Sequence, residues 1–287
     1  MITPELSISE IAYRLEMHLR SLVGPRDPYL GKAKHQLAQQ YLKAEMGKWG
    51  TVRAQNFRSQ GQDYCNWQLT VEGKQPNLAP FLIGAHYDTV PGSLGADDNT
   101  SGLAVLLVLA ELLNKTQPRR SIHLVAFDLE EYGLIGSTTC VKKWKEERRS
   151  LYLMLSLEML GYFSSEARSQ QYPLPALSRI YPDTGNFIAL IGNASTIPKM
   201  MRLKHHLKNA NAPCQWLPVV DKGNALSATR RSDHAPFWDA GYSALLVTDT
   251  ADLRNPHYHK PSDRIETLDI KMMASITRGL MTYLVEA

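Results

Sequence analysis

Cysteine and long apolar runs are both scarce in this chain of 287 residues. The three cysteines, Cys65, Cys140 and Cys214, lie far apart and form no C-x-x-C pair, which argues against a disulfide framework. No window holds the roughly 18 consecutive apolar residues that a membrane-spanning helix needs. The N-terminal residues contain early acids and no continuous apolar stretch, unlike a signal peptide. The sequence therefore predicts three reduced thiols in a soluble protein of the cytoplasm, the compartment of synthesis, with no membrane contact.

Charge of one sign is also lacking, since 32 Lys and Arg residues face 28 Asp and Glu residues. The basic pairs Arg148-Arg149 and Arg230-Arg231 are too short to resemble a nucleic-acid patch. The balance of charge therefore names no macromolecular partner and argues against nucleic-acid binding. An apolar fraction of 44% suffices for a large core, and neither an internal repeat nor a Gly/Ser-rich linker divides the chain. We expect one domain over residues 1–287, with N-terminal helices in residues 1–50 packing on it.

Apolar spacing predicts an alternation of strands and helices. Ser7 and Glu10 form a Ser-x-x-Glu capping box at the start of the first helix. Further expected helices cover residues 32–48, 101–114, 137–149, 197–209, 233–239 and 268–286. Expected strands cover 52–57, 66–71, 81–85, 122–127, 151–157, 187–191, 215–220 and 244–247. Because most of these strands are fully apolar, the pattern predicts an α/β fold with a mostly parallel, mixed central sheet and helices on both faces. The Pro- and Tyr-rich stretch 164–184 is expected to be a surface insertion near the site.

Acids and histidines follow several of the apolar strands, where the ligands of an α/β sheet gather. Any one of these acids is explained by a turn, but Glu is a poor turn former, and clustered acids without a cation repel one another. Imidazole beside carboxylate is a ligand set for a divalent metal, zinc being the usual one and cobalt or manganese the alternatives. The residues concerned are His86, Asp88, Asp97, Asp98, Asp128, Glu130, Glu131 and Glu158.

Two downstream segments add histidines to this set. Asp233 and His234 are adjacent, and His259 is followed four residues later by Asp263. A metal-bound histidine usually donates its second ring N–H to a carboxylate or a carbonyl. Asp88 beside His86, and Asp263 after His259, are suited to that supporting position.

Six short segments that contain these residues occur in the order found in the co-catalytic di-zinc aminopeptidases, and the sequence resembles that family. Relatives of the family include glutamate-carboxypeptidase-type enzymes and glutaminyl cyclases. The resemblance spans residues 78–285, and any one motif alone is weak. The matching pieces are Ala-His-Tyr-Asp-Thr at 85–89, Gly-Ala-Asp-Asp-Asn-Thr-Ser-Gly at 95–102, Asp-Leu-Glu-Glu-Tyr-Gly-Leu-Ile-Gly-Ser at 128–137, Ser-Leu-Glu-Met-Leu-Gly-Tyr at 156–162, Ser-Asp-His-Ala-Pro-Phe at 232–237, and Tyr-His-Lys-Pro-Ser-Asp at 258–263.

The resemblance implies a role for each matching residue. His86 and Glu158 would bind one zinc ion, Glu131 and His259 the other, and Asp98 would bridge the two. Glu130 would be the general base, Asp88 would orient His86, and Tyr258 would polarise the substrate carbonyl. Asp97 would be a neighbour of the metals, and Asp233 with His234 would shape the substrate pocket. Many secreted members have Asp where this chain has Glu158, which keeps a metal-binding carboxylate on a side chain one methylene longer.

The function implied is a zinc exopeptidase, an aminopeptidase before other types, acting on a peptide or small amide. The sequence leaves other functions open: a glutaminyl cyclase, a carboxypeptidase or deacylase in which Arg230, Arg231 or Arg254 grips a carboxylate, and a peptide-binding module on a peptidase fold. Substrate preference and oligomeric state have no signal in the sequence.

Overall fold

The computed structural model describes residues 6–287. Their helices are α1 (Ile8–Leu22), α2 (Lys32–Gly47), α3 (Gly102–Thr116), α4 (Ile135–Glu146), α5 (Ile197–Asn209), α6 (His234–Asp239) and α7 (Ile270–Glu286). Their strands are β1 (Val52–Ser59), β2 (Gln62–Val71), β3 (Phe81–His86), β4 (Ile122–Phe127), β5 (Leu153–Glu158), β6 (Ile188–Asn193), β7 (Cys214–Val219) and β8 (Ala244–Thr248). The capping box at Ser7 is present. The expected alternation of strands and helices is confirmed.

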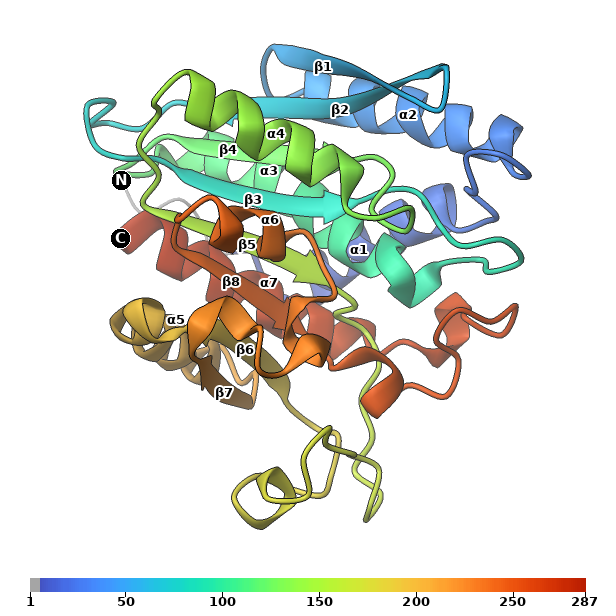
Figure 1. Ribbon diagram of the computed structural model, residues 1–287, viewed down its shortest axis with the longest axis vertical. Helices are drawn as coiled ribbons and strands as arrows, with labels where there is room; N and C mark the ends of the chain where they lie inside the picture. The colour runs from blue at the N-terminus through green and yellow to red at the C-terminus, as the bar shows by residue number, and fades with distance from the viewer. Residues whose placement is uncertain (1–5) are drawn as a thin grey trace.

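All strands join one 8-stranded sheet in the order β1-β2-β4-β3-β5-β8-β6-β7. The central strands β4, β3, β5 and β8 run parallel, whereas β1–β2, β2–β4 and β6–β8 pair antiparallel. The expected mixed, mostly parallel centre is therefore confirmed. Figure 1 shows these strands crossing the middle of the molecule, with the segment 164–184 extending beyond the sheet.

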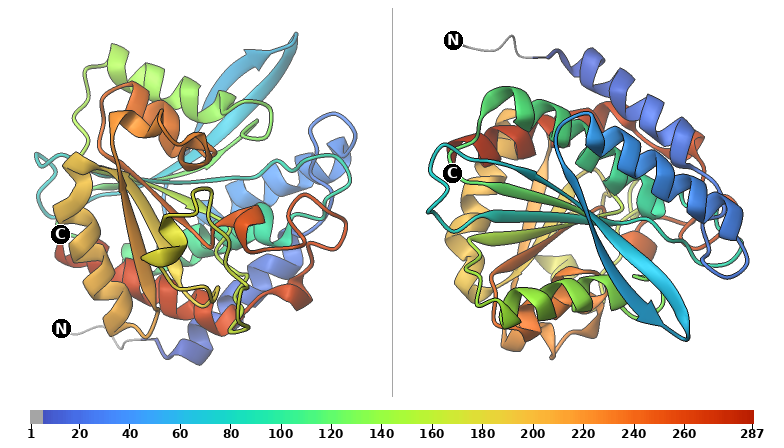
Figure 2. Two further views of the ribbon diagram at one scale, coloured as in Figure 1. Left: turned by 60° about the horizontal axis from the view of Figure 1, so that its bottom comes forward. Right: turned by 90° about the horizontal axis from the view of Figure 1, so that it is seen from above.

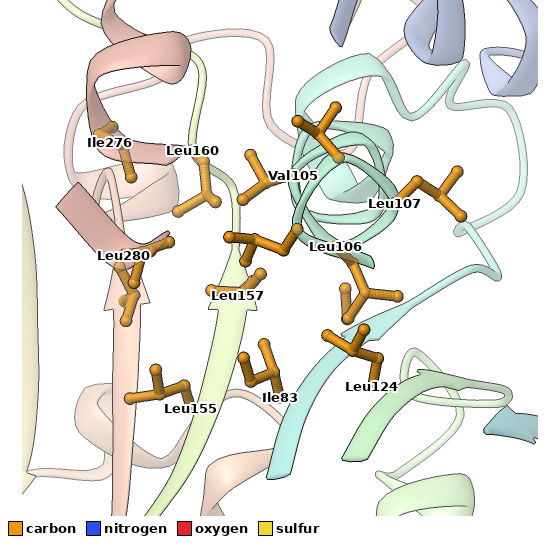
Figure 3. Packing of buried hydrophobic residues seen from close by; sticks show 14 of the residues in the cluster. Ile83, Val105, Leu106, Leu107, Leu124, Leu155, Leu157, Leu160, Ile276 and Leu280 are labelled. Atoms are coloured by element: carbon orange, nitrogen blue, oxygen red, sulfur yellow. The ribbon is translucent and has the colours of Figure 1, made fainter. Parts of the chain in front are cut away.

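Alternate side chains of the central strands enter two separate cores, as the two-residue period of a strand requires. Phe81, Ile83 and Ala85 face the larger core, which α1, α2, α3, α5 and α7 cover. Leu82 faces the smaller core, which α4 and α6 cover. Figure 2 shows the two helix layers on opposite faces of the sheet, and Figure 3 shows Ile83, Leu124 and Leu155 packed beneath α3 and α7.

Arg26 attaches the N-terminal helices to the loop that follows β3. Its side chain is fully buried, and its guanidinium donates to the carbonyls of Tyr87 (2.8 Å), Gly95 (3.1 Å) and Leu22 (2.9 Å). Gly95 has a φ of +62°, and a Cβ there would lie 2.8 Å from Arg26 Nη2. A residue with a side chain at position 95 would therefore clash with the buried guanidinium. Burial lowers the pKa of Arg26 to about 10, while Asp263, Asp88 and Asp98 act in the opposite direction, and Arg26 remains a cation at neutral pH.

We predict that Arg26→Met destabilises the fold by about 3 kcal/mol, because the buried carbonyls that it serves would lose their donor. Chemical denaturation monitored by circular dichroism measures the change. Arg20→Met is the matched control, since Arg20 is exposed and pairs only with Glu16 one helical turn away, an interaction worth about 0.5 kcal/mol or less. Equal effects of the two substitutions would contradict the prediction.

Candidate metal centre

The sheet topology brings three strand ends together. His86 ends β3, which lies between β4 and β5. β4 is followed by Glu130 and Glu131, and Glu158 ends β5. Because the three strands are parallel, their carboxyl ends meet at one edge of the sheet. The acids that the sequence places after separate strands therefore surround the imidazole of the central strand.

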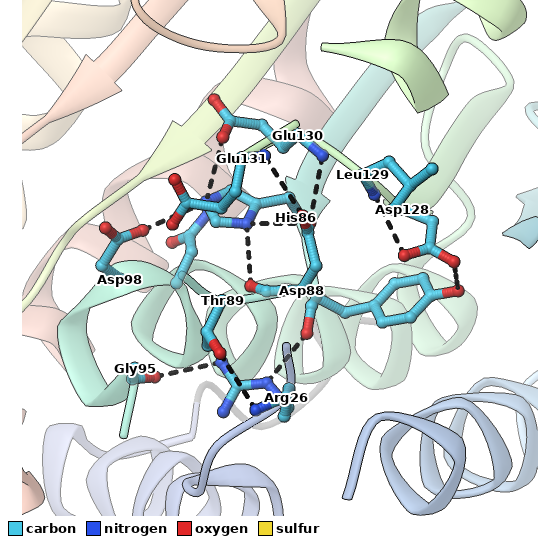
Figure 4. Close-up of polar contacts among 12 residues, drawn as sticks. Arg26, His86, Asp88, Thr89, Gly95, Asp98, Asp128, Leu129, Glu130 and Glu131 are labelled. Carbon is cyan, nitrogen blue, oxygen red and sulfur yellow. Dashed lines mark hydrogen bonds and ion pairs between the residues drawn. The ribbon is translucent and has the colours of Figure 1, made fainter. Parts of the chain in front are cut away.

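Two groups of ligand atoms meet at this edge and share one carboxylate. His86 Nε2 lies 3.2 Å from Asp98 Oδ1 and 3.4 Å from Glu158 Oε1. On the other side, His259 Nε2 lies 3.1 Å from Asp98 Oδ2 and 3.3 Å from Glu131 Oε2. The two oxygens of Asp98 thus face two different histidines. Figure 4 shows Asp98, Glu131 and His86 turned toward one another.

The donor atoms fit a pair of divalent cations. Both groups have spacings that can hold a metal ion, and each combines imidazole nitrogen with carboxylate oxygen, the mixture typical of zinc. Among residues 6–287, Glu131 Oε1 and His259 Nε2 are buried without a hydrogen-bond partner. Buried polar atoms normally have a partner, so these orphaned atoms point to an ion as the missing one. The five residues expected to be ligands from the sequence are the five that the fold brings into these two groups.

Glu130 lies beside the pair of groups. Its Oε2 atom is 4.0 Å from His86 Nε2, and its side chain is nearly buried, with 8% of the residue exposed. Glu130 also forms a third candidate group with His86 and Glu131, so distance alone does not separate base from ligand. It is close enough to share a water molecule with either group.

Crowding and burial shift the pKa values of these side chains in the metal-free protein. Burial raises the pKa of Glu130 well above its usual range, and burial together with Asp98 raises the pKa of Glu131 to about 7. Burial opposes the charged form of His86, but Glu158 and Glu130 raise its pKa well above normal. Burial likewise opposes the charged form of His259, yet the nearby carboxylates of Asp98 and Glu131 raise its pKa to about 10. Without metal, protons therefore occupy this site at neutral pH.

Asp88 supports the site in a broader way than the sequence indicated. His86 Nδ1 lies 3.2 Å from the Asp88 carbonyl and 3.4 Å from its Oδ1 atom, so Asp88 does lie against the ring nitrogen that faces away from the acids. Its two carboxylate oxygens also accept the backbone N–H groups of Glu130 and Glu131, each at 3.1 Å. Asp88 thus fixes the backbone of the acidic pair as well as the ring of His86.

Asp263 supports the site through a different partner from the one expected. Asp263 accepts the backbone N–H groups of Asp97 (2.8 Å) and Asp98 (3.1 Å), and among the hydrogen bonds of residues 6–287 it has none to the ring of His259. The turn that carries Asp98 presents two adjacent buried amides, and a carboxylate satisfies both at once. Asp97 turns away from the two groups and accepts from Gly161 N and Asn255 Nδ2, consistent with a neighbour rather than a ligand.

The pocket-shaping position expected of Asp233 and His234 stays a prediction. Both residues are fully buried, and neither is among the residues that line the two cavities at the site. His234 Nε2 lies 2.8 Å from the Thr229 carbonyl, and its ring packs edge-on against Trp238. The residue that sequence reasoning missed is Ser232, whose hydroxyl donates to Glu158 Oε2 at 2.8 Å. In the sequence, only the position of Ser232 next to Asp233 and His234 could have indicated that it lies at the site.

Two cavities meet at the site. One is lined by Asp98, Glu130, Glu131, Gly133 and Leu134 together with Glu158, Arg231 and Tyr258. The other, called here the apolar cavity, also touches Glu158, Arg231 and Tyr258 but is otherwise lined mainly by apolar and aromatic side chains, among them Tyr172, Leu177, Tyr181, Phe187, Ile191, Trp216, Leu217 and Leu246. The metal groups therefore open directly into an apolar space.

The insertion 164–184 forms one wall of the apolar cavity and is fastened to the loop after β8. Arg254 Nε donates to Gln170 Oε1 at 2.9 Å and its Nη1 to the Phe187 carbonyl at 2.8 Å, while Gln170 Nε2 donates to Thr250 Oγ1 at 2.9 Å. The expected placement of the insertion near the site is confirmed. Arg254 is 7% exposed and is not among the residues that line the two cavities, so it is not positioned to grip a substrate carboxylate there.

Sheet order and site together define an α/β protein with the aminopeptidase-like fold. Residues 66–284 match the model of Peptidase family M28, and the chain belongs to this family of metallopeptidases. The family typically binds two zinc ions, in agreement with the two groups that share Asp98.

Two relatives of this chain are an uncharacterized protein and an aminopeptidase. The chain is 32% identical over 302 residues to the uncharacterized protein YfbL of Escherichia coli, covering 98% of this chain and 89% of that protein. It is 29% identical over 224 residues to the aminopeptidase YwaD of Bacillus subtilis, covering 76% of this chain and 43% of that protein.

Solved structures share the fold at low sequence identity. The LapA aminopeptidase of Legionella pneumophila has a TM-score of 0.74 at 18% identity, covering 98% of this chain and 72% of that one. A glutaminyl cyclase of Tannerella forsythia has a TM-score of 0.69 at 18% identity, covering 99% of this chain and all of that one (100%).

Within residues 6–287, no helix is both long and apolar enough to cross a membrane.

We predict that zinc binding near neutral pH releases at least two protons, one from each imidazole and a further fraction from Glu131, whose pKa of about 7 leaves it partly protonated. His86 and His259 have raised pKa values in the metal-free protein, so each carries a proton that must leave before its nitrogen can bind metal. Zinc affinity should therefore fall as the pH is lowered. Isothermal titration calorimetry in two buffers of different ionisation enthalpy measures the number of protons released.

Variants at the two histidines complete this test. His259→Ala should lose one zinc ion and release fewer protons, and His86→Ala should lose the other zinc ion. His205→Ala is the control, because His205 lies on the exposed face of α5 away from both groups. Normal zinc content in both ligand variants, measured by inductively coupled plasma mass spectrometry, would refute the assignment.

Proposed function

We propose that the protein is a zinc-dependent aminopeptidase that removes apolar residues from the N-termini of peptides. The observation that carries the proposal is the pair of ligand groups sharing Asp98, next to an apolar cavity that the candidate ligand Glu158 also lines. The family implies peptide substrates. His86, Asp98 and Glu158 would hold one zinc ion, and Asp98, Glu131 and His259 the other.

When bound, the two zinc ions would supply Lewis acidity, which lowers the pKa of a water molecule and polarises the scissile carbonyl. Glu130 is placed to take a proton from that water as the water oxygen adds to the carbonyl carbon, and to deliver it to the amide nitrogen as the C–N bond breaks. The products are a free carboxylic acid and a free amine.

Tyr258 is placed to assist the carbonyl oxygen. Its side chain lines both cavities, where its phenolic O–H can donate to the oxygen on which negative charge develops. Asp88 and Asp263 keep the backbones of Glu130, Glu131 and Asp98 fixed by accepting their N–H groups, so the charged side chains need little rearrangement during the reaction.

The cavity linings favour an aminopeptidase over a carboxypeptidase. Of the described residues that line the two cavities, Arg231 is the sole cation, and Asp252 pairs with it at 2.8 Å. A substrate carboxylate would thus find no unpaired basic group there. A large apolar side chain of the N-terminal residue, in contrast, matches the aromatic and aliphatic lining, and the nearby carboxylate of Glu158 can attract the free ammonium group.

A glutaminyl cyclase is the second candidate, because enzymes of that type share this fold. Cyclisation of an N-terminal glutamine releases ammonia and needs no water as nucleophile. The five candidate ligands favour the hydrolase, as they supply a full set for two ions.

A peptide panel tests the proposed function. The zinc-loaded protein should release leucine and phenylalanine from free N-terminal dipeptides and tripeptides, and mass spectrometry of the products measures the cleavage. N-acetylated versions of the same peptides should be at least about tenfold poorer substrates, because they lack the ammonium group. Cleavage of blocked peptides only would contradict the proposal, and ammonia release from glutamine-initiated peptides would favour the cyclase.

We predict that Glu130→Gln lowers kcat by about 10²–10⁴-fold and leaves the zinc content unchanged, since the amide cannot accept the proton of the water. Steady-state kinetics on a leucine-initiated peptide and metal analysis of the same sample measure the two effects. Glu147→Gln is the control, because the Glu147 side chain is 45% exposed on α4's C-terminal side. Unchanged activity in Glu130→Gln would remove Glu130 from the mechanism.

A further inference from the structure

Three side chains from separate segments form a chain of contacts at the junction of the two cavities. Arg231, which lies shortly before α6, donates from Nη2 to the Tyr258 hydroxyl at 3.0 Å and from Nη1 to Asp252 Oδ1 at 2.8 Å. The ring of Tyr258 stacks on the ring of His259, with centroids 3.7 Å apart and planes inclined by 23°. The phenol is thereby held between a candidate metal ligand and a guanidinium.

We propose that Arg231, held in place by Asp252, is a positioning residue that directs the hydroxyl proton of Tyr258 toward the substrate carbonyl oxygen. This inference rests on the proposed function and deepens it. It gives Arg231 a role different from the carboxylate grip that a carboxypeptidase would need.

The direction of the proton follows from the donor inventory. A guanidinium only donates hydrogen bonds, so the Tyr258 oxygen must use a lone pair to accept from Arg231. Its own proton then cannot point at Arg231, and within residues 6–287 the hydroxyl has no other hydrogen-bond partner. Because Tyr258 lines the same cavity as Asp98, Glu130 and Glu131, the proton is available to an oxygen of a substrate bound in that cavity.

Asp252 explains why Arg231 stays in this position. The side chain of Arg231 is 45% exposed, and an exposed arginine without a partner would sample many rotamers. One nitrogen of the planar fork binds the carboxylate of Asp252 while the other reaches the phenol, a geometry that lysine cannot reproduce with its single ammonium group. The charge of Asp252 also offsets that of Arg231, which weakens any attraction to a substrate carboxylate.

The effect should appear in kcat rather than in KM, because the Tyr258 proton matters most when the carbonyl oxygen gains negative charge. Removing one donor of this kind typically lowers kcat by about 10²–10³-fold, so Tyr258→Phe should fall in that range. Loss of the positioning alone should cost less, about tenfold, since the hydroxyl remains and only its orientation is lost.

A double-mutant cycle tests the inference on the zinc-loaded protein with a leucine-initiated peptide. Arg231→Met should lower kcat about tenfold when Tyr258 is present and less than about twofold in the Tyr258→Phe background. Arg231→Lys should recover only part of the loss, and Asp252→Ala should resemble Arg231→Met. Arg230→Met is the matched control, since Arg230 pairs with Asp239 and lines neither cavity, and it should retain wild-type kcat.

A second measurement does not depend on turnover. Isothermal titration calorimetry measures the affinity for the phosphonic acid analogue of leucine, whose tetrahedral phosphorus imitates the tetrahedral carbon formed during hydrolysis. The affinity should fall in Arg231→Met and in Tyr258→Phe, and it should fall no further in the double variant. Zinc analysis of every sample checks that His259 still binds metal after the ring stacked on it is changed.

The outcomes separate the inference from the proposed function. An active wild type in which Arg231→Met lowers kcat by the same factor in both backgrounds would overturn the positioning role alone. A rise in KM confined to peptides with a free C-terminal carboxylate would overturn it too, in favour of a carboxylate grip. A wild type that neither cleaves the peptide panel nor binds the phosphonic acid would overturn the proposed function and this inference with it.

Discussion

The structure depends on holding four carboxylates, Asp98, Glu130, Glu131 and Glu158, in one nearly dry place at the edge of the sheet. Like charges at such distances repel strongly when water is excluded. Two imidazoles and the buried guanidinium of Arg26 provide opposite charge within the protein, and divalent ions would complete the balance. The N-terminal helices matter to the site for this reason, because their connecting segment carries Arg26 behind the acidic loops.

The backbone around the site adopts unfavourable conformations that orient the candidate ligands and the base. Leu129, Met159 and His259 all have positive φ values, of 55°, 49° and 58°, and each precedes, follows or is a candidate ligand or base. Such conformations cost about 1–3 kcal/mol each in residues other than glycine. Leu129 and Met159 are fully buried, so their side chains offset part of this cost by packing. The local backbone is thus bent to aim neighbouring carboxylates, and the hydrophobic core stabilises the result.

The sequence predicts the elements well because most are long and strongly patterned. The strand Ile122–Phe127 and the helix Ile197–Asn209 have the bounds that their apolar spacing indicates, and the candidate ligands were identified by motifs whose order the sheet explains. Residues that act through tertiary contacts were not predictable. Asp263 accepts from Asp97 N across 166 positions, Arg26 binds carbonyls more than sixty positions away, and neither pairing leaves a local pattern. Proximity in sequence misled the interpretation of Asp263, which lies near His259 in the chain but serves another loop.

The insertion 164–184 has a consequence for how this protein diversifies. It contributes no strand to the sheet, contains only the short 3-10 turn Leu177–Arg179, and is fastened through Gln170 to Arg254 and Thr250. Its tip can therefore accumulate changes without disturbing the strands that carry the acids. Because residues of this segment line the apolar cavity, substitutions in it would reshape that cavity while the candidate metal ligands stay in place.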